Sequence, residues 1–133
     1  NYKNEKKLFK KLVGKNKNYI FIHDDPKRNI KIDTSKLENK FHIIKNNEKN
    51  FIFDYGLIIE QAKEIHLIES SLRQLSETLK IKSKKLFLYK DSRVDYSMSL
   101  YNKKLKGWNS TSKKWKEIKI SNIEKFNNFL KFL

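Results

Sequence analysis

Apolar residues recur at helical spacing in several parts of the chain. In EKKLFKKLV (5–13) they fall on one stripe with lysines opposite, and Gly14 follows, which predicts an amphipathic helix that ends at a glycine. A shorter helix, capped near Asp33 or Thr34, is predicted in DTSKLENK (33–40). Further helices with the same spacing are predicted over 51–64, 70–81 and 121–133.

Short apolar runs without helical spacing alternate with these helices. They are NYIFIH (18–23), FHIIK (41–45), EIHLIE (64–69) and KKLFLYK (84–90). Continuous apolar runs joined by short helical connections are typical of parallel strands that are covered on both faces by helices. We therefore predict a single Rossmann-like α/β domain of three layers, with a mainly parallel sheet of about four strands. Its core spans 18–90, and a C-terminal extension (91–133) ends in a helix.

Composition narrows the chemistry that this domain can carry. A chain of 133 residues with 38 % hydrophobic content suits one domain with one core. Cysteine is absent, which excludes disulfides and thiolate metal sites, and the three histidines lack metal-ligand spacing. The sequence has no glycine-rich phosphate loop and no apolar run of roughly 20 residues. We expect a cytoplasmic protein without a metal or a resident cofactor.

The net charge of +16 points to an anionic partner, and its make-up indicates which kind. The cations are 28 lysines and only 3 arginines, beside 14 asparagines and 15 isoleucines. Nucleic-acid surfaces rely on arginine for bidentate and stacking contacts, whereas an excess of Lys, Asn and Ile follows from AT-rich coding DNA. We therefore rank an anionic small ligand, or an anionic membrane at whose periphery the protein would sit, above nucleic acid.

The strand ends are the expected ligand site, because open parallel sheets bind ligands where the chain leaves the C-terminal ends of the strands. This rule selects the loop 23–26, the loop after Ile44 and the pair Ser70–Ser71. The serine pair opens a predicted helix, whose free N–H groups and positive dipole end attract anions. Two interpretations stay open: a hydroxyl that caps the helix, and a hydroxyl that meets a diphosphate.

The other candidates also have a structural and a functional interpretation. Asp24 and Asp25 form either a turn before a proline or a contact to a metal, a proton or a nucleotide. His23 is either a packed strand residue or a catalytic one, while His66, inside an apolar run, is expected in the core. Arg73 places a cation near the serine pair, or is a solvated helix residue.

Taken together, YIFIHDDPKRN (19–29), FDYGLIIEQAKEIHLIESSLRQLSETL (53–79) and KKLFLYK (84–90) resemble the C-terminal half of a GT-B-type glycosyltransferase. They are most similar to the fucosyltransferase-like group. In that group a strand ends in Asp-Asp-Pro, and a later strand closes on a Ser-Ser or Asp-Ser pair before a helix. The segment KKWKEI (113–118) is similar to the tail of related bacterial sugar transferases.

This resemblance implies a site for a nucleotide-sugar donor and transfer of the sugar to a hydroxyl acceptor. Asp24 and Asp25 match the residues beside the nucleotide, and Ser70–Ser71 match the pair that meets the diphosphate. His23 stands where the group often has a small polar residue. Arg73 joins this predicted donor site by its position on the following helix. The resemblance does not identify a catalytic residue in this chain.

The resemblance also implies a second, N-terminal domain with a basic motif, and nothing before Tyr19 is similar to it. Because the chain also begins at Asn1, we expect either a fragment, completed by that domain or by a homo-oligomer, or a stand-alone nucleotide-binding relic. The alternative is a basic, non-enzymatic nucleic-acid-binding or ribosome-associated protein. In that case Trp108, Trp115 and the lysines of the tail would form a stacking surface.

Overall fold

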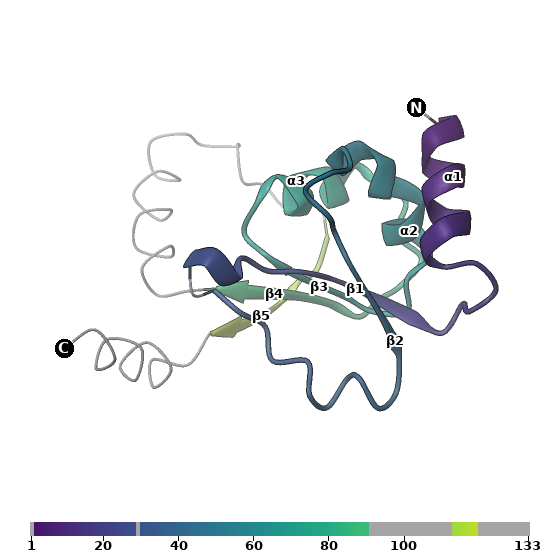
Figure 1. The fold of residues 1–133 in the computed structure, drawn as a ribbon. Coiled ribbons are helices and arrows are strands. Elements are labelled where there is room, and N and C mark those ends of the chain that lie inside the picture. The colour runs from purple at the N-terminus through teal and green to yellow at the C-terminus, as the bar shows by residue number, and fades with distance from the viewer. Residues whose placement is uncertain (1, 29, 91–112, 120–133) are drawn as a thin grey trace, which may run out of the picture.

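The computed structural model describes residues 2–28, 30–90 and 113–119 (Figure 1). Its elements, with η for 3-10 helices, are α1 (Tyr2–Leu12), β1 (Tyr19–His23), η1 (Pro26–Arg28), β2 (His42–Lys45), η2 (Ile52–Tyr55), α2 (Gly56–Gln61), β3 (Ile65–Ile68), α3 (Ser71–Thr78), β4 (Leu86–Lys90) and β5 (Lys116–Lys119). The predicted helix over 121–133 and Trp108 lie outside the described residues.

The strands form one open sheet of five parallel strands in the order β2-β1-β3-β4-β5. The predicted α/β fold with a parallel sheet is therefore confirmed, and β5 adds a fifth strand beyond the four predicted. The first connection runs from β1 to β2 on one side, and the following connections run toward β3 and β4 on the other. β1 and β3 are thus neighbours whose outgoing connections diverge.

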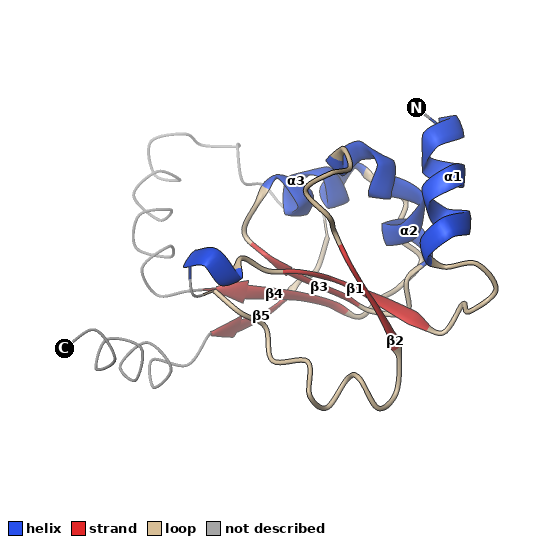
Figure 2. Ribbon diagram, in the orientation of Figure 1, coloured by secondary structure: helices blue, strands red, loops and turns tan. Residues whose placement is uncertain are grey.

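Strand order and handedness decide which face of the sheet each connection covers. Right-handed crossovers that run in opposite directions along a sheet lie on opposite faces. Figure 2 shows α1, α2 and α3 together on one face, while segment 30–41 crosses the other. The helices predicted for both faces thus lie on only one face within the described residues. The described layer on the other face consists of an extended stretch followed by turns over 35–40.

The helix predicted over 33–40 does not form as a regular helix, although Leu37 N and Glu38 N both donate to Thr34 O at 2.9 Å and close a first turn. Asp33 Oδ1 accepts a hydrogen bond from Ser35 N at 3.0 Å, and the Thr34 hydroxyl donates to Glu38 at 2.8 Å. What remains is a series of turns over residues 35–40. The apolar side chains of this segment still pack on the sheet, and they are Ile30, Ile32, Leu37 and Phe41.

Alternation along the strands divides the core between the two faces. In β1, Tyr19 and Phe21 point to the helices, whereas Ile20 and Ile22 point to segment 30–41, and all four are at most 1 % exposed. A strand that is buried on both faces reads as a continuous apolar run, and this is why β1 could be recognised from the sequence.

The helix layer confirms most of the predicted helices and shows how they fit together. α1 ends at Leu12, and Gly14 takes a positive φ of 58°, as predicted for a glycine after a helix. The helix predicted over 51–64 begins as η2 and becomes α-helical at Gly56. A Cβ at Gly56 would meet the carboxylate of Glu5 in α1, so a larger residue there would require the Glu5 side chain to move.

Candidate functional site

Of the three loops predicted as the ligand site, those after β1 and β2 are in contact at the C-terminal end of β1, and the third follows the neighbouring strand β3. His23 pairs with Leu67 of β3, so the chain after each of these strands leaves the sheet side by side. His23 Nδ1 also lies 2.5 Å from Asn46 Oδ1, in the loop after β2. Because the connections after β1 and β3 go to opposite faces, this is the switch point where doubly wound sheets bind ligands.

Tyr55 holds the loop after β2 in place. This tyrosine is fully buried, its ring lies 5.6 Å from that of Phe21, and its hydroxyl accepts a hydrogen bond from Asn47 N at 2.6 Å. The amide of Asn50 also approaches the same hydroxyl, at 3.4 Å. The loop that carries Asn46, the partner of His23, is therefore anchored to the core through one phenol.

The two aspartates after β1 organise their own loop. Asp24 has a side chain only 4 % exposed, and its Oδ2 accepts a hydrogen bond from Ile32 N at 3.0 Å and pairs with Lys45 Nζ at 3.5 Å. Asp25 exchanges both backbone hydrogen bonds with Ile30, at 2.8 and 3.0 Å. Asp24 thus joins the loop to β2 rather than forming a turn around the proline, and its carboxylate is engaged by protein groups.

The serine pair does not cap α3 through its side chains in the predicted way. Ser70 occupies the N-cap position with extended backbone, but its side chain makes no capping hydrogen bond to the helix. Its hydroxyl donates instead to Ile68 O at 3.2 Å. Ser71 begins the helix and is exposed. The capping interpretation is therefore wrong for the Ser70 side chain, and Ser70 bonds to the helix only through its carbonyl, which accepts from Gln74 N at 3.2 Å.

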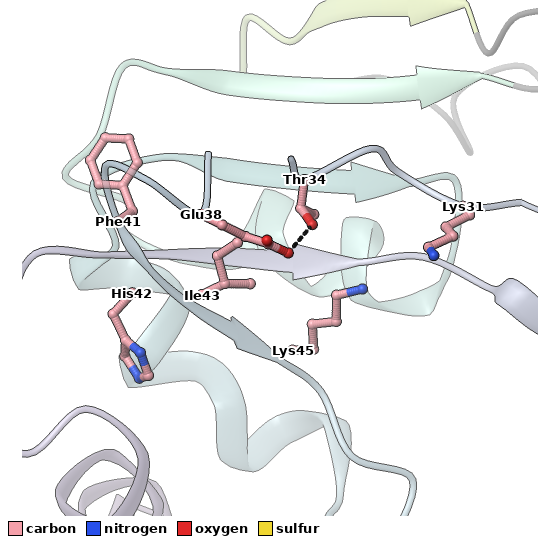
Figure 3. A pocket seen from close by; sticks show the side chains of 7 residues that line it. All are labelled: Lys31, Thr34, Glu38, Phe41, His42, Ile43 and Lys45. Carbon is pink, nitrogen blue, oxygen red and sulfur yellow. Dashed lines mark hydrogen bonds between the residues drawn. The ribbon is translucent and has the colours of Figure 1, made fainter. Parts of the chain in front are cut away.

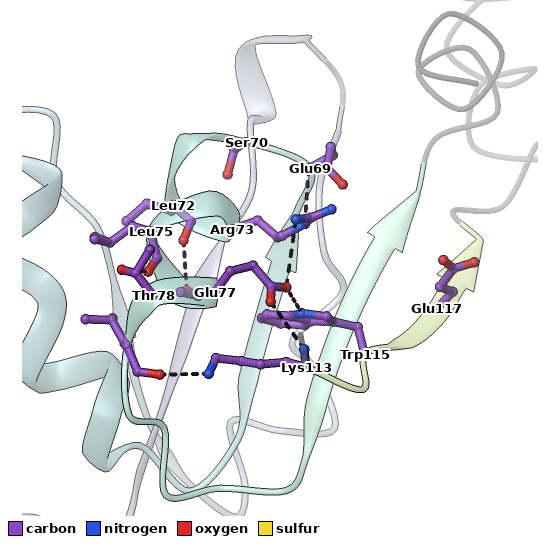
Figure 4. A network of polar contacts seen from close by, with 12 residues as sticks. Glu69, Ser70, Leu72, Arg73, Leu75, Glu77, Thr78, Lys113, Trp115 and Glu117 are labelled. Atoms are coloured by element: carbon purple, nitrogen blue, oxygen red, sulfur yellow. Dashed lines mark hydrogen bonds and ion pairs between the residues drawn. The ribbon is translucent and has the colours of Figure 1, made fainter. Parts of the chain in front are cut away.

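Arg73 is buried under the start of α3 rather than solvated (Figure 4). Its Nε lies 3.1 Å from Glu69 Oε1 and its Nη1 lies 3.8 Å from Glu77 Oε1. The Arg73–Glu69 contact is a close ion pair without hydrogen-bond alignment. Burial raises the pKa of Glu69, and the charges of Arg73 and Lys90 oppose this rise. Arg73 thus neutralises two carboxylates instead of pointing a free cation at the strand ends.

One of these carboxylates, Glu77, attaches the segment before β5 to α3, a contact that the sequence did not predict. The Trp115 indole N–H donates to Glu77, and Lys113 contributes its backbone N–H to Glu77 at 3.3 Å and its Nζ to Leu79 O at 2.7 Å. Trp115 also packs against the core. Glu69, Arg73 and Glu77 are spaced four residues apart, and this spacing could have predicted the two ion pairs of Arg73 from the sequence.

His66 lies in the core, as predicted, and connects two polar side chains on the face opposite the helices. Its ring stacks on Phe87 with centroids 4.6 Å apart, and Nδ1 and Nε2 lie 2.8 Å from Tyr89 Oη and 3.0 Å from Glu64 Oε1. A carboxylate can only accept, so Nε2 donates to Glu64 and Nδ1 accepts from the phenol. Burial lowers the pKa of His66, and the bond to Glu64 opposes this effect.

This lowered pKa predicts a loss of stability in mild acid. In the unfolded chain His66 takes up a proton near its ordinary pKa of 6.5, whereas in the fold it stays neutral to lower pH. The free energy of unfolding should therefore fall as pH drops below 6.5. Urea unfolding from pH 8 to pH 5 measures this, and His66→Gln should flatten the slope in that window. Parallel curves for the two proteins would show that His66 is not responsible.

A cavity of about 370 Å³ lies beside β2, on the face covered by segment 30–41 (Figure 3). Lys31 and Lys45 stand at one end of it, and Phe41 and His42 at the other. Lys45 also pairs with Asp24, so the cationic end of the cavity adjoins the loop after β1. Its volume falls within the range of small-molecule sites, about 300–1,000 Å³.

Neither a metal site nor a membrane-spanning helix is found in the part of the chain that the structure describes. Among residues 2–28, 30–90 and 113–119, no three acidic or histidine side chains come together in a way that could hold a metal ion. In these ranges no helix has both the length and the hydropathy to cross a bilayer. Comparison of the chain with protein-family models, curated proteins and solved structures found no match.

Proposed function

We propose that this chain is a nucleotide-sugar-binding domain of a glycosyltransferase, with the donor bound at the ends of β1 and β3. The observation that carries the proposal is the position of His23 at the switch point of a 2-1-3-4-5 parallel sheet, in contact with the loop after β2 and next to the end of β3. The resemblance of the segments around Asp24–Asp25 and Ser70–Ser71 to the fucosyltransferase-like group supports it.

The structure suggests how the predicted donor residues divide the work. The exposed Ser71 and the first N–H groups of α3 are suited to a diphosphate, because a helix N-terminus attracts anions. His23 faces the same edge of the sheet and is steered by Asn46. Asp24 and Arg73 are already engaged by protein groups, so we assign them to shaping the loops around the donor rather than to touching it.

Calorimetric titration with GDP, UDP, ADP and CMP tests this proposal. One nucleoside diphosphate should bind saturably and keep most of its affinity when salt is added. In Ser71→Asp a carboxylate replaces the diphosphate at the helix N-terminus, which favours the helix but repels the ligand, so binding should weaken by about ten-fold or more. Ser35→Asp adds the same charge on the opposite face of the sheet and should bind like the parent.

The result also separates this proposal from its alternative. A nucleic-acid-binding protein would bind a single-stranded oligonucleotide with steep salt dependence and show little preference among small nucleotides. The structure weakens one part of that alternative, because Trp115 is bonded to Glu77 and packed against the core. If Ser71→Asp and Ser35→Asp reduce nucleotide binding equally, the result would contradict a site at α3.

A further inference from the structure

The three large hydrophobic side chains that the described part of the chain leaves exposed all belong to one side of the helix layer. They are Tyr2, Phe51 and Phe53, with exposed fractions of 61 %, 79 % and 63 %. Tyr2 begins α1, and the two phenylalanines flank the start of η2. α1 packs directly on η2, and Figure 1 shows the N-terminal end of α1 and the segment leading into α2 together at the top of the view.

This aromatic group is accompanied by more lysines than acids. α1 holds five lysines, all exposed, and one acidic residue, Glu5, which lies against Gly56. Lys6 Nζ lies 4.5 Å from the centre of the Tyr2 ring. η2 adds the half-buried Asp54, and in the loop before it Glu48 is paired with Lys27 at 3.4 Å. α1 packs on η2, and we call α1 together with segment 48–55 the α1–η2 face.

We propose that the α1–η2 face docks on an anionic lipid bilayer. Lysines near an anionic surface add attraction that sums over the array, while aromatic side chains insert at the boundary between headgroups and acyl chains. The net charge of +16 is complementary to such a surface. Nucleic acid is the poorer fit, because neither α1 nor segment 46–55 contains an arginine to contact phosphate and bases bidentately.

Docking would also bring the bilayer close to the switch point. Asn46, the partner of His23, and Phe51 are five residues apart in one loop, a span of at most about 18 Å. If the donor binds at the switch point as proposed above, the acceptor would be a hydroxyl group on a membrane-bound molecule. Only this step rests on the proposed function. The docking itself does not require a nucleotide, so it can fail or succeed independently of the proposed function.

Co-sedimentation with vesicles tests the docking face on the whole chain. Vesicles of phosphatidylcholine mixed with phosphatidylglycerol should retain the protein at least about ten-fold better than phosphatidylcholine alone, and high salt should weaken the binding. Phe51→Ser combined with Phe53→Ser should reduce binding to the mixed vesicles by about ten-fold or more. Both positions are exposed, so thermal unfolding of the double variant should match that of the parent.

A matched pair of charge reversals decides between a defined face and diffuse attraction. Lys6→Glu with Lys10→Glu changes α1, whereas Lys36→Glu with Lys40→Glu makes the same change in charge on the opposite face of the sheet. The first pair should abolish most vesicle binding, and the second should preserve it. Equal losses in both pairs would overturn the proposal.

Two further results would also overturn it. In one, the variant with Phe51→Ser and Phe53→Ser keeps full vesicle binding but changes from a dimer to a monomer. The phenylalanines would then contact a second copy of the chain. In the other, a single-stranded oligonucleotide binds through the same phenylalanines and displaces the vesicles, which would assign the face to nucleic acid.

Discussion

Replacing Arg73 by methionine is expected to lower the free energy of unfolding by about 3 to 5 kcal/mol, because it removes the buried cation that pairs with two mostly buried carboxylates. The side chains of Arg73, Glu69 and Glu77 are 5 %, 14 % and 12 % exposed. Methionine fills a similar volume, so the loss comes mainly from the charges that remain unpaired. Urea unfolding followed by far-ultraviolet circular dichroism measures it.

A rescue variant distinguishes the effect of charge from that of packing. Adding Glu69→Gln and Glu77→Gln to Arg73→Met makes the network neutral, so most of the lost stability should return. The loss in the single variant should also narrow as pH falls, because burial already raises the pKa of Glu69 and its protonation removes one unpaired charge. If the triple variant is as unstable as Arg73→Met at every pH, packing rather than charge controls this region.

The parallel sheet could be predicted because its inner strands are buried on both faces. All four residues of β3 are buried, as are the first four of β1, so the only strongly polar residue in these runs is the buried His66. β5 escaped prediction for the opposite reason. In Lys116–Lys119 only Ile118 is apolar and three positions are exposed, because this strand borders the described sheet on one side. It forms a strand because it pairs with β4, and the local sequence pattern does not predict this pairing.

Segment 30–41 shows how tertiary packing overrides a local helix signal. The residues after Asp33 have helix-forming composition, and Asp33 accepts a hydrogen bond from Ser35 N as a capping residue does, yet only turns form over 35–40. Before them, Ile30 and Ile32 are buried against the sheet in an extended stretch tied to Asp24. The chain must span the face from β1 to β2, and these contacts could not be read from the spacing of apolar residues.

The arrangement of the strand ends was predictable, whereas the state of the side chains there was not. A general property of parallel sheets places these ends at one edge, where His23 contacts the loop after β2 and lies beside β3. Whether Asp24 faces a ligand or the protein depends on Ile32 and Lys45, which are distant in sequence. Arg73 is a different case, since its two partners lie four residues away on either side and were visible in the sequence.

Tyr55 offers the second large effect, and it connects stability to the candidate site. Tyr55→Ala should cost about 3 to 5 kcal/mol of unfolding free energy, because it opens a cavity beside Phe21 at a fully buried position. Tyr55→Phe keeps the ring and removes only the hydroxyl that accepts the Asn47 N–H, so it should cost about 1 to 2 kcal/mol. Thermal and urea unfolding of both variants measure these losses.

The phenylalanine variant tests whether this phenol orders the loop that carries Asn46. Without the hydroxyl, amide hydrogen exchange over 46–50 should speed up, and nucleotide binding at the switch point should weaken with it. Tyr19→Phe is the matched control, since Tyr19 is equally buried and donates to Ile58 O at 2.6 Å without contacting the loop. It should lose similar stability while leaving both loop exchange and nucleotide binding unchanged. Identical behaviour of the two variants would mean that the loop responds to global stability rather than to the Tyr55 hydroxyl. That result would contradict the predicted coupling between the core and the candidate site.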